Sequence, residues 1–293
     1  MLPVRQHGAV FPPPDTLVVV RQEFDPGYGE EPFRSLCLDY PDGAVYPHEH
    51  FRLEWGAVFH RGRLDGSARV LVIGLAPGQL EVVVRRVIVG HAGQRLQGLL
   101  AKLGIERSYV MVNAFLYSAY GHAGLVPLQN DPLVVEYRHR WLSTIFASGR
   151  IEAVIALGAR ADTAWKLWCE HSGGAMQGVA YASIPHPTQP ESAAKDDAKR
   201  YDAAMERMLG EWNAALRVLK PAIRHPDVER PLIPYGRKLL SGDTLPIPSH
   251  DLPPGLPVWM GCRDHWTHRS GETPLQKRGN LTIDAPREFL PGT

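Results

Sequence analysis

The sequence predicts an α/β protein of three layers, with a central four-stranded parallel sheet flanked by helices. Two observations predict this fold class. Apolar, β-branched runs recur at residues 69–73, 109–113, 153–157 and 179–184, and amphipathic helical patterns lie between them. Strands that alternate with helices form a parallel sheet with helices on both faces, connected by right-handed crossovers. We therefore expect four parallel strands in one sheet.

Helical periodicity identifies the elements between and after these strands. Apolar residues spaced three and four apart predict helices over residues 92–103, 133–148, 159–171 and 194–219. One stripe of the last helix carries large apolar side chains that we expect to pack in the core: Tyr201, Met205, Met208, Leu209, Trp212 and Leu216.

The chain divides into three parts by composition. Residues 1–50 mix Pro, Gly and acidic residues around one apolar run, so we expect a lead-in that packs on the core. Residues 51–219 hold the expected strands and helices and form the core domain. Residues 220–293 are rich in Pro and Gly but retain Trp259 and Trp266, which predicts an ordered extension packed against the core.

Composition narrows the class of protein. The 293 residues are 44% hydrophobic and 22% charged, which is typical of a globular protein. A net charge of +1 argues against a histone-like nucleic-acid binder, so any binding to DNA must depend on a local basic patch. The three cysteines lack the spacing of a zinc or iron–sulfur site and fit a reducing compartment. With neither a signal-peptide pattern nor an apolar run of membrane-spanning length, we expect a soluble cytoplasmic protein. We also expect a monomer that uses no cofactor.

Polar signals follow three of the expected strands at the point where each one ends. Gly74 to Glu81 (GLAPGQLE) follows the first strand, Asn113 ends the second, and His186-Pro187-Thr188 follows the fourth. Carboxyl ends of parallel strands lie at one edge of the sheet, where ligands bind in open α/β folds. Each signal alone also fits an ordinary turn, cap or buried histidine. Their convergence on one edge predicts a catalytic site.

The same residues resemble the motifs of the uracil-DNA glycosylase superfamily. The run Gly74-Leu75-Ala76-Pro77-Gly78 is similar to the water-activating G-x-x-P motif, and Gly74 to Gly93 keeps the motif spacing of the iron–sulfur branch. Val112-Asn113 resembles the strand-end Asn that reads the base, and His186-Pro187-Thr188 resembles the H-P-S motif that precedes a DNA-intercalating loop. The resemblance covers residues 50–217 and implies a DNA glycosylase of this α/β fold.

Some positions depart from the superfamily pattern. Ala76 stands where the best-known branch has its water-activating Asp, and Leu75 stands where other branches have Glu or Gln. Ile88 corresponds to the aromatic residue that stacks on the flipped base; it can pack on a base but offers no π-face. The cluster cysteines are missing as well. The chain therefore resembles an outlier branch without a metal.

The resemblance implies a role for each catalytic residue in the removal of uracil from DNA. Asn113 would pair with N3–H and O4 of uracil, and His186 would donate a hydrogen bond to O2 as negative charge develops on the departing base. Gln79 would orient the water, and Glu81 would take its proton. The base would first have to leave the single- or double-stranded DNA, with the loop around Pro187 acting as a wedge.

The resemblance also implies two sets of binding residues. The first would line the base pocket together with Asn113: Gly74, Leu75, Ala76, Pro77, Gly78 and Ile88. The second would contact DNA around the flipped nucleotide: Arg85, Arg86, Pro187, Thr188 and Gln189. Arg95 flanks the first motif and is a further phosphate-contact candidate, whereas a solvated helix face is the more ordinary explanation of Lys195, Lys199 and Arg200.

Two other functions are compatible with the same residues. A superfamily fold without a carboxylate at position 76 also fits a protein that binds deaminated or single-stranded DNA without cutting it. A glycosylase for another deaminated base, such as hypoxanthine, fits as well. A metal site is the less favoured interpretation of His48, Glu49 and His50. With 13 histidines in the chain, an H-x-H pattern is expected to occur by chance. We expect neither His91 nor His122, which lie near the motifs, to be catalytic.

Overall fold

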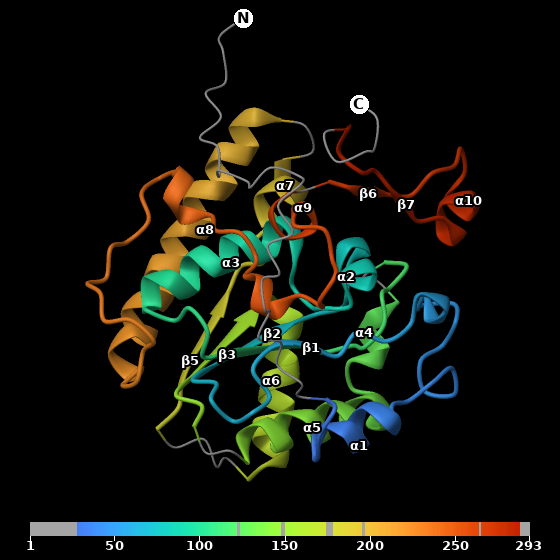
Figure 1. The fold of residues 1–293 in the computed structure, drawn as a ribbon, viewed down its shortest axis with the longest axis horizontal. Coiled ribbons are helices and arrows are strands. Elements are labelled where there is room, and N and C mark those ends of the chain that lie inside the picture. Colours follow the sequence, from blue (N-terminus) through green and yellow to red (C-terminus); the bar gives the residue numbers. More distant parts are fainter. Residues whose placement is uncertain are drawn as a thin grey trace, which may run out of the picture.

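The computed structural model describes residues 28–121, 124–147, 150–173, 178–194, 197–263 and 265–287. A five-stranded sheet in the order β1-β3-β2-β4-β5 lies at its centre (Figure 1). The strands are β1 (His60–Gly62), β2 (Val70–Gly74), β3 (Tyr109–Asn113), β4 (Ala153–Leu157) and β5 (Ala180–Ile184). β2 pairs parallel with β3 and β4, and β4 pairs parallel with β5, which confirms the α/β class and the four parallel strands expected from the sequence.

The remaining strand of this sheet, β1, has no counterpart in the sequence analysis. It pairs antiparallel with β3, with His60 opposite Val112 and Gly62 opposite Val110. Its His-Arg-Gly sequence has no apolar alternation, so periodicity could not identify it. The strand is defined by its pairing with the edge of β3, which is a tertiary contact.

Helices cover both faces of the sheet, which gives the three expected layers (Figure 1). One face is covered by α1 (Phe33–Leu38), α5 (Pro132–Phe146) and α6 (Ala159–His171). The other face is covered by α3 (Gly90–Leu103) and α8 (Ala198–Leu219). Shorter elements are α2 (Gln79–Val84), α4 (Leu125–Leu128), α7 (Gln189–Ala194), α9 (Trp259–Cys262), α10 (Pro274–Gly279), β6 (Thr267–His268) and β7 (Thr282–Ile283).

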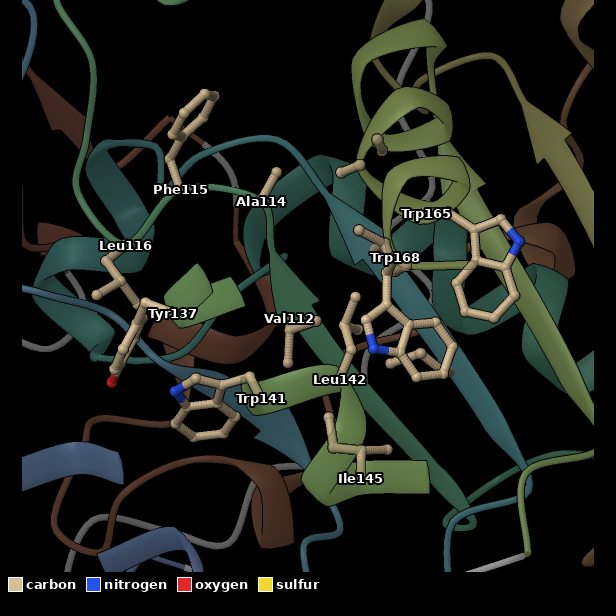
Figure 2. Packing of buried hydrophobic residues seen from close by; sticks show 14 of the residues in the cluster. Val112, Ala114, Phe115, Leu116, Tyr137, Trp141, Leu142, Ile145, Trp165 and Trp168 are labelled. Carbon is tan, nitrogen blue, oxygen red and sulfur yellow. The ribbon is translucent and has the colours of Figure 1, made fainter. Parts of the chain in front are cut away.

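Alternate residues of the central strands pack into two separate hydrophobic cores, one on each face of the sheet. Leu71 and Ile73 of β2 pack with α5 and α6, whereas Val70 and Val72 pack with α3 and α8. Figure 2 shows the first core, in which Val112 of β3 lies among Trp141, Leu142, Ile145 and Trp168. Burial on both faces explains why these strands read as continuous apolar runs.

The helix expected over residues 194–219 begins later than predicted. α7 ends at Ala194 and α8 begins at Ala198, because the Asp197 side chain accepts hydrogen bonds from the backbone N–H groups of Lys199 and Arg200 at 2.9 and 3.2 Å. An aspartate in this position is a strong helix N-cap. The apolar stripe of α8 is buried as expected from Met205 to Leu216, and Tyr201 is partly buried.

The segment after α8 crosses the surface of the core. Its residues Ile247, Leu252, Trp259 and Trp266 form a third apolar cluster with α2 and the turn that follows it.

The expected N-terminal lead-in is described only from residue 28. Its apolar run at residues 17–20 lies outside the described residues, as do His122 and Lys195. Within the described ranges, no helix has the length and apolarity needed to cross a bilayer.

Candidate active site

Gly74 and Asn113 lie side by side at the carboxyl ends of β2 and β3. They are register partners, and the pairing continues past the strands because the N–H of Ala114 donates to the carbonyl of Gly74 at 2.9 Å. A Cβ atom on residue 74 would lie 2.2 Å from Oδ1 of Asn113, far closer than a real contact allows. Glycine at this position therefore leaves the space that the Asn113 amide occupies.

Ile88 completes the group around this amide. A Cβ on residue 74 would also lie 3.3 Å from Cδ1 of Ile88, so both side chains converge on the same point. The Nδ2 atom of Asn113 is buried and has no hydrogen-bond partner among the described residues. Buried amide groups are nearly always satisfied, so an orphaned donor at a sheet edge is typical of a ligand site.

The loop between β2 and α2 carries no carboxylate. Leu75 and Ala76 are partly buried against the apolar core, and Pro77 is buried. Gly78 is the N-cap of α2, and Gln79 is its first residue. The Oε1 atom of Gln79 is buried without a hydrogen-bond partner in the described part of the chain, which leaves an acceptor that a water or a ligand can use.

Glu81 holds this loop together. Its two carboxylate oxygens accept hydrogen bonds from the backbone N–H groups of Gly78 and Ile88, one oxygen each. Burial raises the pKa of this carboxyl from 4.5 to about 7, although the two backbone bonds and the Arg61 guanidinium oppose the shift. Because both oxygens are engaged, this geometry favours a loop-organising role over the water-activating role expected from the sequence.

The turn at Ile88 is fixed from two sides. Ile88 has a positive φ of 53°, and Nε and Nη2 of Arg61 donate to the carbonyls of Val87 and Ile88 at 3.0 and 2.9 Å. Gly93 of α3 packs on the same carbonyl, since a Cβ there would lie 2.1 Å from it. Arg61 is itself paired with Asp251, at 2.9 Å. Neither Arg61 nor Asp251 was expected from the sequence, because a single charged residue in a three-residue strand or a Pro-rich segment carries no pattern.

His186 is exposed, and its hydrogen bonds define its tautomer. The backbone N–H of Thr188 donates to Nδ1 of His186 at 3.3 Å, and Oγ1 of Thr188 lies 2.9 Å from the same nitrogen. Because Nδ1 accepts, the hydrogen of the neutral ring is on Nε2. In its neutral form, the ring therefore presents an Nε2–H donor.

Arg95 connects this histidine loop to α3. Its guanidinium donates to the carbonyl of Pro187 at 2.5 Å and to both carboxylate oxygens of Glu191 at 3.1 and 2.7 Å. Arg95 is only 2% exposed, so it organises the loop and cannot contact a phosphate. Thr188 and Gln189 stay partly exposed, whereas Pro187 is buried.

Arg85 and Arg86, both expected to contact DNA, differ in exposure. Arg86 is buried and donates to the hydroxyl of Tyr28, so it does not reach the surface. The Arg85 guanidinium donates to the carbonyls of Trp55 and Ala57 at 2.8 and 2.6 Å and thereby ties two loops together. Burial of Arg86 argues against its expected phosphate contact. Arg85 stays exposed, so its contact with DNA remains a prediction.

The expected site residues therefore fall into three linked groups. Gly74, Ile88 and Asn113 surround one buried point, and the loop of His186 joins them through Arg95 and α3. Gly78, Gln79 and Glu81 line a pocket of about 200 Å³ at the start of α2. Two residues missed by the sequence analysis, His265 and Thr267, complete this pocket from the C-terminal segment. No sequence signal marked them, since nearness to α2 is a property of the fold alone.

Comparison with known proteins identifies the family. A family model of the uracil DNA glycosylase superfamily matches residues 61–209, which is half of the chain. The match runs from β1 into α8 and includes all of the expected site residues. A search of curated proteins finds no match to the chain. The length of the family match, together with the fold and the three strand-end motifs, shows that this chain belongs to the uracil DNA glycosylase superfamily.

Proposed function

We propose that this protein is a monofunctional DNA glycosylase that removes uracil from DNA by hydrolysis of the N-glycosidic bond and leaves an abasic site. Membership of the superfamily suggests glycosylase-type chemistry on DNA. The observation that carries the choice of base is the Asn113 amide, whose Nδ2 is buried without a partner in the described residues, beside Gly74 and Ile88. A base that accepts from this nitrogen would remove the cost of the orphaned donor.

The Asn113 amide has the complement of groups that uracil presents. Its Oδ1 would accept from N3–H, and its Nδ2 would donate to O4. Cytosine presents an acceptor at N3 and a donor at the neighbouring amino group. The Oδ1 acceptor of Asn113 would then face an acceptor, and its Nδ2 donor would face a donor. A buried polar group left unpaired costs about 1–3 kcal/mol, which corresponds to roughly five- to 150-fold in selectivity.

His186 would stabilise the departing base. Bond cleavage places negative charge on O2 of uracil, and the Nε2–H of His186 is a donor suited to that anion. A neutral imidazole suffices, because a hydrogen bond to an ionised acceptor is about twice as strong as one between neutral groups. The pairing of Nδ1 with Thr188 keeps the hydrogen on Nε2.

Water activation would depend little on a carboxylate. Position 76 carries a methyl group, and both oxygens of Glu81 are engaged by backbone N–H groups. The buried Oε1 of Gln79, which has no partner among the described residues, would orient a water and would not deprotonate it. The oxocarbenium-like sugar would then be stabilised mainly by DNA phosphates and protein dipoles, and a weak nucleophile would suffice.

One alternative rests on the same observation about Glu81. A chain with a methyl group at position 76 and a fully engaged Glu81 also fits a protein that flips and holds a deaminated base without cutting the bond. A pocket with different shape would accept hypoxanthine instead of uracil.

Single-turnover base release separates these functions. The substrates are matched oligonucleotides with one deoxyuridine, one deoxyinosine or only normal bases, and alkali cleavage reveals abasic sites. His186→Ala, purified in parallel, shows whether the activity belongs to this chain. The proposal is supported if the wild type releases uracil and His186→Ala does not. If only hypoxanthine is released, the reaction is as proposed but the base is different. Binding of DNA without release of any base favours the non-catalytic function.

A further inference from the structure

The C-terminal arm, residues 265–287, forms one wall of a basic cleft. The cleft has a volume of about 410 Å³ and is lined by Arg52, Tyr120, Arg269, Glu272, Lys277 and Arg278. Four of these side chains are cationic and one is anionic. Within the described residues, none of the four cations forms an ion pair with a carboxylate. The described lining of the cleft therefore carries a net positive charge.

Aromatic rings hold two of the guanidinium groups in place. Cζ of Arg52 lies 4.7 Å from the ring centre of Trp55 and 4.4 Å from that of Tyr120. Cζ of Arg278 lies 4.8 Å from the same Tyr120 ring. Burial and the nearby charges of Arg269 and Arg278 lower the pKa of Arg52, whereas the carboxylate of Glu54 opposes the shift. Cations interleaved with aromatic rings are typical of surfaces that follow a nucleic-acid backbone.

The arm is a preorganised element. Oε1 of Gln276 accepts from the backbone N–H groups of Glu272 and Thr273 at 2.7 and 3.0 Å, and the Thr273 hydroxyl caps α10 in return. Nδ2 of Asn280 donates to the carbonyl of Ser270 at 2.9 Å and closes the hairpin. These bonds present Lys277 and Arg278 on a fixed turn, which lowers the entropic cost of binding an anion.

Each wall of the cleft is connected to an element of the candidate active site. β6 packs against α2. His265 and Thr267 share a pocket with Gln79 and Glu81. On the other wall, Tyr120 follows the loop that leaves Asn113 at the end of β3. A DNA strand with its flipped nucleotide at Asn113 would therefore run close to the cleft.

We propose that Arg269, Lys277 and Arg278, which are exposed, bind the phosphodiester backbone of the DNA strand beside the flipped nucleotide. Arg52 is only 3% exposed and donates to the carbonyl of Ala119, so it supports the wall of the cleft. The inference rests on the proposed function for the presence of DNA, and it assigns the C-terminal arm, which lies outside the matched residues 61–209, to substrate binding. Phosphate contacts position a strand without reading its sequence. The cleft thus contributes affinity and orientation, while Asn113 contributes the choice of base.

Salt-dependent DNA binding tests this assignment. The arm variant combines Arg269→Gln with Arg278→Gln, and the control combines Arg207→Gln with Arg217→Gln, two exposed arginines of α8 without ion pairs in the described residues. We expect the arm variant to bind a single-stranded deoxyuridine oligonucleotide about tenfold more weakly and to lower the slope of log K against log salt by about 1.4. The matched thymidine oligonucleotide should lose the same factor, and the control should bind as the wild type does.

The outcomes separate this inference from the proposed function. Equal binding and equal slopes for the wild type and the arm variant would overturn the assignment of the cleft, even if uracil is released normally. A loss confined to the arm variant supports the assignment, even if the wild type releases no base. Equal losses in the arm and control variants would show only the effect of net charge and would overturn it. Failure of the wild type to bind DNA would overturn both proposals.

Discussion

The Arg61 guanidinium and the Asp251 carboxylate form a fully buried ion pair between residues 190 positions apart in the chain, with Nη1 and Oδ2 2.9 Å apart. The Tyr109 hydroxyl donates to the same carboxylate oxygen at 2.5 Å. The Arg61 guanidinium also donates hydrogen bonds to the backbone carbonyls of Val87 and Ile88. The segment after α8 therefore helps to position the turn that brings Ile88 to Asn113.

Asp251→Asn should destabilise the protein by about 3–5 kcal/mol, because it leaves the Arg61 charge buried without a counter-charge. Urea unfolding measures the loss. Asp284→Asn is the control, since its pair with His268 is exposed and contributes at most about 1 kcal/mol. Equal stability of the two variants would mean that Asp251 does not compensate the buried charge.

Glu81→Gln should lower stability more than catalysis. The variant keeps one oxygen acceptor but turns an amide donor toward a backbone N–H, at a cost of about 1–3 kcal/mol. If Glu81 were the general base, the rate of base release would fall about 10²–10⁴-fold with the fold intact. Thermal unfolding and single-turnover rates below the unfolding range distinguish the two, and Glu211→Gln on the exposed face of α8 is the control.

The Glu81 carboxyl should also make stability depend on pH. Its pKa is raised to about 7 in the folded protein, from 4.5 in the unfolded chain, so the folded state holds an extra proton between these values. The stability linked to this proton is fully present below pH 4.5 and is lost as pH rises through 7. Glu81→Gln should remove this component, and an unchanged pH profile in that variant would contradict it.

Gly74→Ala should disrupt the site through Asn113. The new methyl group would lie 2.2 Å from Oδ1 and displace the amide, and a shift of about 1 Å is enough to cost about 100-fold in rate. Gly210→Ala is the matched control, because a Cβ at that helical position meets nothing within 4 Å. Wild-type rates in Gly74→Ala would place the Asn113 amide outside the site.

Asn113→Asp should change base selectivity while the protein stays folded. The substitution replaces the Nδ2 donor by an acceptor, which removes the contact to O4 of uracil and suits the amino group of cytosine. Competition between deoxyuridine and deoxycytidine oligonucleotides measures the change, with Asn130→Asp on the surface as the control. An unchanged preference would remove Asn113 from base recognition.

His186→Ala should reduce base release by about 10²–10³-fold without loss of stability, because one donor to the developing anion is removed from an exposed loop. Thr188→Ala should have a smaller effect, since the backbone N–H of residue 188 still orients the ring. Full activity of His186→Ala would require another residue to stabilise the leaving base.

The sequence by itself determined the α/β class, the four parallel strands and the order of the three strand-end motifs. These properties are local: periodicity marks each strand and helix, and parallel pairing brings the strand ends to one edge. The structure adds the strand order and register, which pair Gly74 with Asn113 at that edge.

Only the tertiary structure decided which polar groups are satisfied. Glu81 reads as a catalytic carboxylate in the sequence, yet two backbone N–H groups engage both of its oxygens. Arg86 and Arg95 read as phosphate ligands and are buried. The arm that carries Arg269 and Arg278 shows no motif, and its place beside α2 depends on long-range packing. Burial and hydrogen-bond partners depend on contacts between distant segments, and spacing along the chain does not encode them.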